Sequence, residues 1–119
     1  GTNDIGPLLS ALDCLTNTSP QEGTPLVVCE AMLCQVPIVS TRVGAIPEME
    51  AIAGHPLVYG VPDIPLTNEL AAAIRTVCTV SQAADMARAY KFAKSHLTMT
   101  AMAARWEQYL REIILASQV

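Results

Sequence analysis

The sequence predicts an α/β fold in which a small parallel sheet is flanked by helices. Short segments typical of strands alternate with helix-type segments over the first 60 residues, and this alternation is typical of β-α units. Further helical patterns occupy the rest of the chain. Three short strands are few for a parallel sheet that is covered on both faces, so we expect a partial Rossmann-like sheet.

The individual elements follow from hydrophobic spacing and from capping residues. Apolar runs predict strands at 14–17, 36–40 and 57–59, and Gly60, Pro62 and Pro65 predict a loop after the third strand. Helices are expected at 4–12, 24–34, 67–77, 81–95 and 98–116, with a single helical turn at 46–50. The expected N-caps are Asp4, Thr24 (followed by Pro25 as the first helical residue), Thr67 or Asn68, Ser81 and Thr98.

Charge is distributed unevenly along the chain. Residues 1–70 carry eight acidic side chains and one basic one, Arg42, whereas residues 71–119 carry six basic and three acidic ones. The net charge of the whole chain is −4. Because a nucleic-acid-binding protein normally carries a basic face, we expect no nucleic-acid partner. An anionic ligand of the first part would have to be held by backbone dipoles or by cations outside this chain.

The cysteines and the lack of long apolar runs favour a cytoplasmic location. Cys14, Cys29, Cys34 and Cys78 form no C-x-x-C pair and lie in apolar runs, which favours small buried thiols in a reducing compartment over a metal site. No apolar run reaches the roughly 20 residues of a membrane span. The chain begins without Met and without a signal-peptide pattern, so we expect it to be part of a longer protein.

The expected functional site is the segment 19–32. It follows a parallel strand and opens a helix, which is where ligands bind in doubly wound α/β sheets. Gly23 would let a ligand approach the backbone, and the first-turn amides of Leu26, Val27 and Val28 have no partner within the helix. Since these amides lie at the positive end of the helix dipole, a phosphate is the expected ligand.

Two carboxylates in this segment are candidate ligand contacts. Glu30 lies in the second turn of an otherwise apolar helix, where a buried carboxylate needs either a structural ion pair or the paired hydroxyls of a ribose. Glu22 lies in the loop before the helix, where it either interacts with the helix N-terminus or reaches the mouth of the site. Residue chemistry alone leaves both alternatives open for each glutamate.

The sequence resembles the retaining glycosyltransferases of the two-domain GT-B fold, in family 4, over nearly its whole length. Glu22 and Glu30 match the paired glutamates of that family. The other matching stretches are Gly1-Thr2-Asn3-Asp4, Ser10-Ala11-Leu12-Asp13, the segment Ser19 to Met32, Pro37-Ile38-Val39 and Gly44-Ala45-Ile46-Pro47-Glu48. The chain departs from the family pattern at Gln35 and Ala45, where glycines are usual, and at Thr24, where a bulkier residue is common.

The resemblance implies a place in the architecture of a larger enzyme. Residues 1–97 would be a partial nucleotide-sugar-binding domain, the second half of a GT-B C-terminal domain. Residues 98–119 would be a helix that packs back on an N-terminal domain. The basic residues that neutralise the donor diphosphate in the family lie in the first half of that C-terminal domain. We therefore expect the isolated chain to be inactive.

The resemblance also implies an activity, hexosyl transfer from a nucleotide-diphosphate sugar to an acceptor in glycan biosynthesis. The anomeric configuration is retained, and neither a metal nor another cofactor is expected. Glu22 would lie near the transferred sugar and Glu30 would hold the ribose hydroxyls, and these two are the expected catalytic residues. The further donor contacts implied are Ser19, Gly23, Thr24, Leu26 and Val27.

Two surfaces of the helical part have alternative interpretations. The last predicted helix carries apolar residues at alternating steps of three and four, which suit either an ordinary core stripe or a seam that docks on a separate domain. These residues are Met99, Met102, Trp106, Tyr109 and Ile113. Arg88, Lys91 and Lys94 form either a solvated face or a contact for an anionic membrane surface.

Two other functions remain open at this stage. Sugar-nucleotide epimerases share the architecture but lack the pattern of the 19–32 segment. A non-catalytic interaction module could reuse half of the same fold.

Overall fold

Three parallel strands form a sheet in the computed structural model, which describes residues 4–118. β1 (Leu15–Asn17) pairs with β2 (Ile38–Thr41), and β2 pairs with β3 (Tyr59–Val61). Leu15 lies opposite Ile38, and Val39 lies opposite Tyr59. Every residue of β2 is buried, as expected for a central strand covered on both faces. The predicted α/β fold with a partial Rossmann-like sheet is confirmed.

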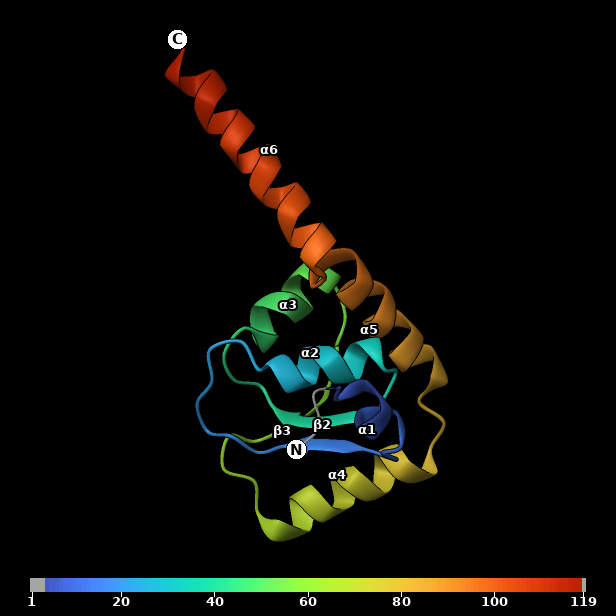
Figure 1. Ribbon diagram of the computed structural model, residues 1–119. Helices are drawn as coiled ribbons and strands as arrows, with labels where there is room; N and C mark the ends of the chain where they lie inside the picture. Colours follow the sequence, from blue (N-terminus) through green and yellow to red (C-terminus); the bar gives the residue numbers. More distant parts are fainter. Residues whose placement is uncertain (1–3, 119) are drawn as a thin grey trace.

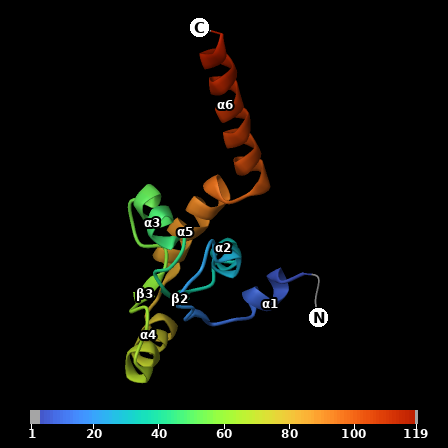
Figure 2. The ribbon, with the colours of Figure 1, turned by 90° about the vertical axis from the view of Figure 1, so that its left-hand side faces the viewer.

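Helices cover both faces of this sheet (Figures 1 and 2). On one face lie α1 (Gly6–Ser10), α2 (Leu26–Leu33), α3 (Ile46–Ala53) and α5 (Ala83–His96), and their apolar side chains share one core with Ile38. On the other face lies α4 (Thr67–Thr79). Its buried residues Ala73 and Val77 pack with Val39, the neighbour of Ile38 on β2. The side chains of β2 thus alternate between the two cores.

β2 and β3 each begin two residues later than the sequence predicts, because other groups take their backbone hydrogen bonds, and β1 begins one residue later, at Leu15. The amide N–H of Val36 donates to the Ala31 carbonyl at the end of α2 (3.0 Å), and Pro37 has no N–H, so β2 starts at Ile38. The amides of Leu57 and Val58 donate to the Glu50 carboxylate (2.9 and 3.4 Å). β3 therefore starts at Tyr59 and includes the Gly60 predicted for a loop.

Several helix ends also differ from the prediction. The N-caps are Ile5, Pro25, Leu66 and Gln82, in place of Asp4, Thr24, Thr67 or Asn68, and Ser81. Asp4 still accepts a hydrogen bond from the Gly6 amide (3.1 Å). The predicted single turn at 46–50 is the full helix α3, which ends at Gly54 in a left-handed conformation (φ 73°). The predicted cap Thr98 is confirmed, since its hydroxyl accepts from the Ala101 amide (3.2 Å).

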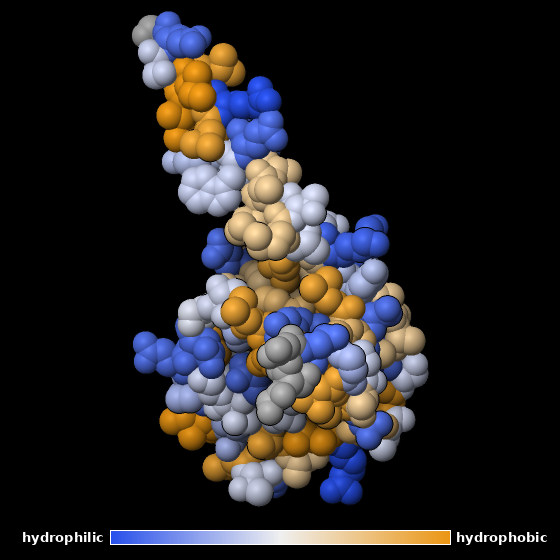
Figure 3. Space-filling model, viewed as in Figure 1, coloured by the Kyte–Doolittle hydropathy of each residue, from blue (hydrophilic) through white to orange (hydrophobic). Residues whose placement is uncertain are grey.

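The last helix, α6 (Met99–Ser117), projects from the body of the molecule (Figures 1 and 2). None of its described residues is buried. The predicted seam residues Met99, Met102, Trp106, Tyr109 and Ile113 are all exposed. Apolar side chains cover one side of the outer half of α6 and polar ones the other (Figure 3). The interpretation of these residues as an ordinary core stripe is therefore wrong for this helix within the chain.

The cysteines are less uniformly buried than the sequence predicts. Cys29 is buried, Cys14 and Cys34 are half-buried, and Cys78 is exposed, so the prediction of a buried thiol is wrong for Cys78. Burial raises the pKa of the Cys29 and Cys14 thiols above the usual value. Within residues 4–118, no helix combines the length and the apolar composition that crossing a membrane requires.

Candidate functional site

Two loops meet at the carboxyl edge of the sheet, one after β1 and one after β2. The Ala45 amide donates to the Gly23 carbonyl oxygen (2.8 Å). Gly44 has φ 60°, and a Cβ atom placed there would lie 2.0 Å from the same oxygen. The close approach and the left-handed backbone explain why glycine stands at position 44. The loop with Glu22 is thus held against the loop that follows β2.

The first residue of the candidate segment is also tied to β2. Thr41, the last residue of that strand, donates its hydroxyl hydrogen to the Ser19 carbonyl oxygen (2.6 Å). The Ser19 hydroxyl in turn donates to the Gln21 carbonyl oxygen (2.9 Å). The Ser19 side chain, predicted to contact the donor, therefore shapes the loop in this structure.

The start of α2 presents unused amide groups beside this loop. No residue among 4–118 accepts a hydrogen bond from the amides of Gly23, Thr24, Leu26 or Val27. The prediction is wrong for Val28, whose amide donates to the Pro25 carbonyl (3.0 Å) because the helix begins with a tighter turn. The remaining amides lie at the positive end of an eight-residue helix.

The two predicted glutamates differ in exposure. Glu22 is exposed in the loop and makes no capping hydrogen bond to α2. Glu30 is half-buried in the second turn of that helix. Within the described part of the chain it has neither an ion pair nor a side-chain hydrogen bond, so the structural ion pair considered for it is not formed.

The glycine at position 23 has no structural role that the folded chain reveals. A Cβ atom at Gly23 would meet no heavy atom within 4 Å, and its φ lies outside the left-handed region. The chain conformation therefore does not require glycine at this position. The open space beside Gly23 is compatible with the predicted close approach of a ligand to the backbone.

Arg42, the single basic residue of the first 70, is engaged on the other side of β2. Its Nε donates to Glu50 Oε2 (2.8 Å). A Cβ atom at Gly60 would lie 1.9 Å from its guanidinium, so the Arg42 side chain lies against β3. Through Glu50, which also accepts from the Leu57 amide, this pair fastens α3 to the start of the third strand.

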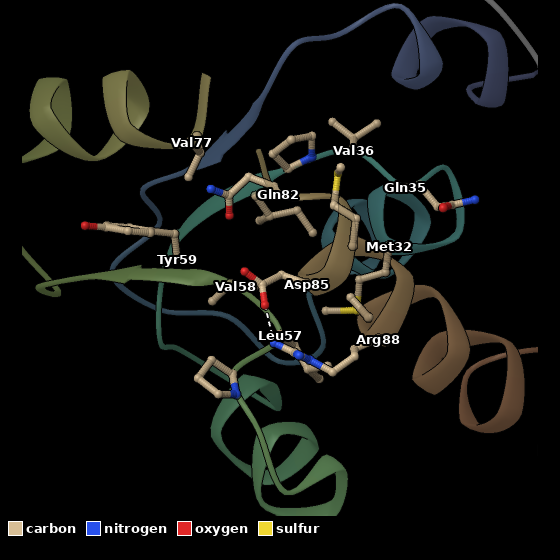
Figure 4. A pocket seen from close by; sticks show the side chains of 15 residues that line it. Met32, Gln35, Val36, Leu57, Val58, Tyr59, Val77, Gln82, Asp85 and Arg88 are labelled. Atoms are coloured by element: carbon tan, nitrogen blue, oxygen red, sulfur yellow. Dashed lines mark hydrogen bonds and ion pairs between the residues drawn. The ribbon is translucent and has the colours of Figure 1, made fainter. Parts of the chain in front are cut away.

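A cavity of about 190 Å³ lies at the opposite, amino-terminal edge of the sheet (Figure 4). Its lining includes Met32, Val36, Leu57 and Ala89, with an exposed ion pair between Arg88 and Asp85 at its rim. It contains none of the predicted site residues. The hollow is floored by core side chains, whereas the unused amides of α2 and the carboxylates of Glu22 and Glu30 lie at the carboxyl edge.

The predicted basic set on α5 does not form a dense patch. Arg88 is paired with Asp85, whereas Lys91 and Lys94 are exposed, with the Lys94 ammonium 5.6 Å from the ring centre of Tyr90. The arrangement resembles a solvated helix face more than a membrane contact.

Sequence reasoning missed the supporting role of Thr41. A polar residue that ends a fully buried strand was the available signal, because a buried hydroxyl needs a partner. Gly44 belongs to a stretch that matches the family pattern, but its contact with Gly23 joins residues far apart in the sequence and has no local signature.

Comparison with known proteins gives a family match for the part of the chain that contains both loops. A sequence model for the family described as "Glycosyl transferases group 1" matches residues 1–80, which include both loops and all of α2. Comparison with curated proteins and with solved structures gave no significant match. Since the family match covers two thirds of the sequence, the chain belongs to the glycosyl transferases group 1 family.

Proposed function

We propose that this chain forms part of the donor site of a retaining GT-B glycosyltransferase of family 4, and that the whole enzyme transfers a hexosyl group from a nucleotide-diphosphate sugar to an acceptor. The observation that carries the proposal is the set of unused amides at the start of α2, next to a glycine with open space beside it. Helix N-termini of this kind bind phosphate groups. The family match over the same residues supports the assignment to sugar transfer.

The backbone amides near the start of α2 and the Glu30 carboxylate have separate roles in this proposal. The amides of Gly23, Thr24, Leu26 and Val27 bind the diphosphate and the adjoining sugar. Glu30, unpaired and half-buried, accepts hydrogen bonds from the two ribose hydroxyls.

Glu22 lies near the transferred sugar in the proposed complex. Positive charge develops on the sugar ring when the bond to the diphosphate breaks, and a nearby carboxylate stabilises this charge. Retention of the anomeric configuration in the product of the whole enzyme is the expected outcome, measured by NMR of the product. Inversion would contradict this part of the proposal.

The charge balance leads us to propose that the isolated chain does not turn over. The departing diphosphate is a strong anion, whereas Arg42 is committed to Glu50. The compensating cations and the acceptor site would then lie on other parts of the enzyme. Activity of the 119-residue chain at the rate of a complete enzyme would refute this.

The exposed helix α6 supports a further part of the proposal, the division at residue 97. Its apolar residues recur at alternating steps of three and four, and none is buried. We place an N-terminal domain of the enzyme against this face.

Donor binding is tested by titrating the ¹⁵N-labelled chain with UDP-, GDP- and ADP-glucose. The proposal expects shifts confined to the amides of residues 22–30 at millimolar ligand. Glu30→Gln should weaken the affinity about ten-fold, because a charge-assisted hydrogen bond is lost.

A matched control is Glu112→Gln on α6, which changes an exposed acid and should leave the affinity unchanged. In the described part of the chain, the Glu112 side chain bonds only Gln108 (2.9 Å). Absence of any shift in the unmutated chain would contradict donor binding and favour a non-catalytic interaction module.

A further inference from the structure

We infer that Thr41 is a positioning residue of the candidate donor site, because its hydroxyl group fixes the loop 19–23 that carries Glu22 into α2. The inference rests on the proposed function for its consequence in binding. The loop geometry does not depend on the proposed function.

The hydrogen bond from Thr41 continues the link between two strands beyond the end of their pairing. Backbone pairing between β1 and β2 ends at Asn17 and Ser40. The next residue, Thr41, pairs with Val61 of β3 on its other side. Its hydroxyl reaches back to the Ser19 carbonyl at 2.6 Å, which is short for an O–H···O bond. The loop after β1 is therefore fastened to the central strand two residues after β1 ends.

A second bond fastens the other end of the same loop. The Ala45 amide donates to the Gly23 carbonyl at 2.8 Å. The two hydrogen bonds hold the loop at residues 19 and 23, on either side of Glu22 in the sequence.

Side-chain packing does not replace these anchors. Pro20, Gln21, Glu22 and Gly23 are all exposed, and among residues 4–118 the only other bond within the loop joins the Ser19 hydroxyl to the Gln21 carbonyl. Loss of the Thr41 bond would therefore free the amino end of the loop. Misplacement of a charged group by about 1 Å is enough to weaken its action on a ligand.

Thr41 itself is well placed for this role. It is fully buried, with 0% of its surface exposed, at the end of a strand whose neighbours are core residues. Its own side chain therefore has no freedom to leave the Ser19 carbonyl, whereas an exposed hydroxyl would exchange partners with water.

The test compares three variants of the full 119-residue chain. Thr41→Val keeps the shape of the side chain but loses the donor, and Thr41→Ser keeps the donor. The matched control is Thr76→Val on α4, which removes a hydroxyl-to-carbonyl bond to Ala72 (2.9 Å) far from the loop in sequence.

The first measurement needs no ligand. Amide relaxation of residues 21–24 reports the order of the loop, which is high in the unmutated chain if the inference holds. Thr41→Val should lower this order, Thr41→Ser should restore it, and Thr76→Val should leave it unchanged. A mobile loop in the unmutated chain would overturn the inference even if Thr41→Val fails to fold, and so would an unchanged loop in Thr41→Val.

The second measurement is the affinity for UDP, GDP and ADP, with the tightest binder taken as the probe. We expect Thr41→Val to bind about three- to ten-fold more weakly than the unmutated chain, the effect of one hydrogen bond, and Thr41→Ser to bind nearly as well. Equal affinities for Thr41→Val and Thr76→Val would overturn the inference. If the unmutated chain binds no nucleotide, the proposed function fails, and the loop measurements still decide the role of Thr41.

Discussion

The contact between Gly44 and the loop that carries Glu22 leads to a quantitative prediction for Gly44→Ala. A Cβ atom at position 44 would lie 2.0 Å from the Gly23 carbonyl oxygen and 2.8 Å from that of Glu22. Both distances are shorter than a Cβ atom tolerates, and both neighbours are backbone atoms that no side-chain rotation can move. The substitution must therefore push the two loops apart.

Two terms set the expected loss of stability. The left-handed backbone at φ 60° costs an alanine about 1–2 kcal/mol. Separation of the loops breaks the bond from the Ala45 amide to Gly23, which adds about 1 kcal/mol. We expect the free energy of unfolding to fall by about 2–3 kcal/mol, a loss that a domain of this size survives.

Gly54→Ala is the matched control for the first term. Gly54 has φ 73°, but a Cβ atom there would meet nothing within 4 Å. Gly54→Ala should therefore lower the free energy of unfolding only by the backbone strain of about 1–2 kcal/mol. The difference between the two variants isolates the contact between the loops.

Urea unfolding followed by circular dichroism measures both losses, provided that the slope of the transition is unchanged. Amide spectra of Gly44→Ala should also show shifted signals for Glu22 and Gly23, and Gly54→Ala should leave those signals in place. Equal losses of stability in the two variants, with unshifted loop signals, would refute the contact as a support of the site.

Four further predictions concern the helix end, the ligand contact, the thiols and the charge balance. Gln35 adopts φ 56° at the end of α2, so Gln35→Gly should raise the unfolding free energy by about 1 kcal/mol in urea, whereas Gln35→Ala keeps the strain and should gain nothing. Gly23→Ala should change stability by less than about 1 kcal/mol but weaken nucleotide binding in the NMR titration, because its Cβ atom points into open space that a ligand would occupy. At pH 8 a thiol reagent should label exposed Cys78 first and buried Cys29 last, as followed by mass spectrometry. Because burial raises the pKa of the Cys29 thiol, the unfolded thiol loses its proton at a lower pH than the folded one. The unfolding free energy should therefore fall as pH rises above about 9. Since residues 1–70 carry a net charge of −7, raising the salt from about 20 to about 200 mM should strengthen rather than weaken nucleoside diphosphate binding in calorimetry.

Each of these predictions has a result that contradicts it. Equal gains for the glycine and alanine variants at position 35 would show that backbone strain is absent there. Undiminished nucleotide binding by Gly23→Ala would show that the ligand does not lie on that side of the loop. Early labelling of Cys29 would show that α2 opens easily, and weaker binding in salt would place a strong cation near the ligand.

The fold class was predictable because it depends on patterns within short segments. Leu70, Ile74 and Val77 recur at helical spacing within the predicted helix, and they pack with Val39 of the sheet, while Thr98 marks the start of α6 as predicted. Strand limits were less predictable, because they depend on which distant group takes each backbone hydrogen bond. Glu50, which accepts from Leu57 and Val58, delays β3 in a way that no local pattern reveals.

The meeting of the two loops of the candidate site was predictable for a topological reason, since parallel strands place their following loops at one edge. The hydrogen bonds that hold these loops in place were not predictable. Thr41 and Ser19 are 22 residues apart, and their contact appears only when β1 and β2 lie side by side. The unused amides were mostly predictable from the helix start, except that the tighter first turn engages Val28.

The charge balance explains why this edge would depend on backbone groups. A site built from Arg or Lys side chains would attract a diphosphate at long range, but Arg42 is held by Glu50 and lies against β3. Amide dipoles act only at close range, so their effect depends on the exact path of the backbone. A site of this kind needs a loop that is fixed before the ligand arrives, and the bonds from Thr41 and Ala45 provide such fixation at its two ends. The same dependence predicts that substitutions which move the loop matter more for binding than substitutions which change an exposed charge.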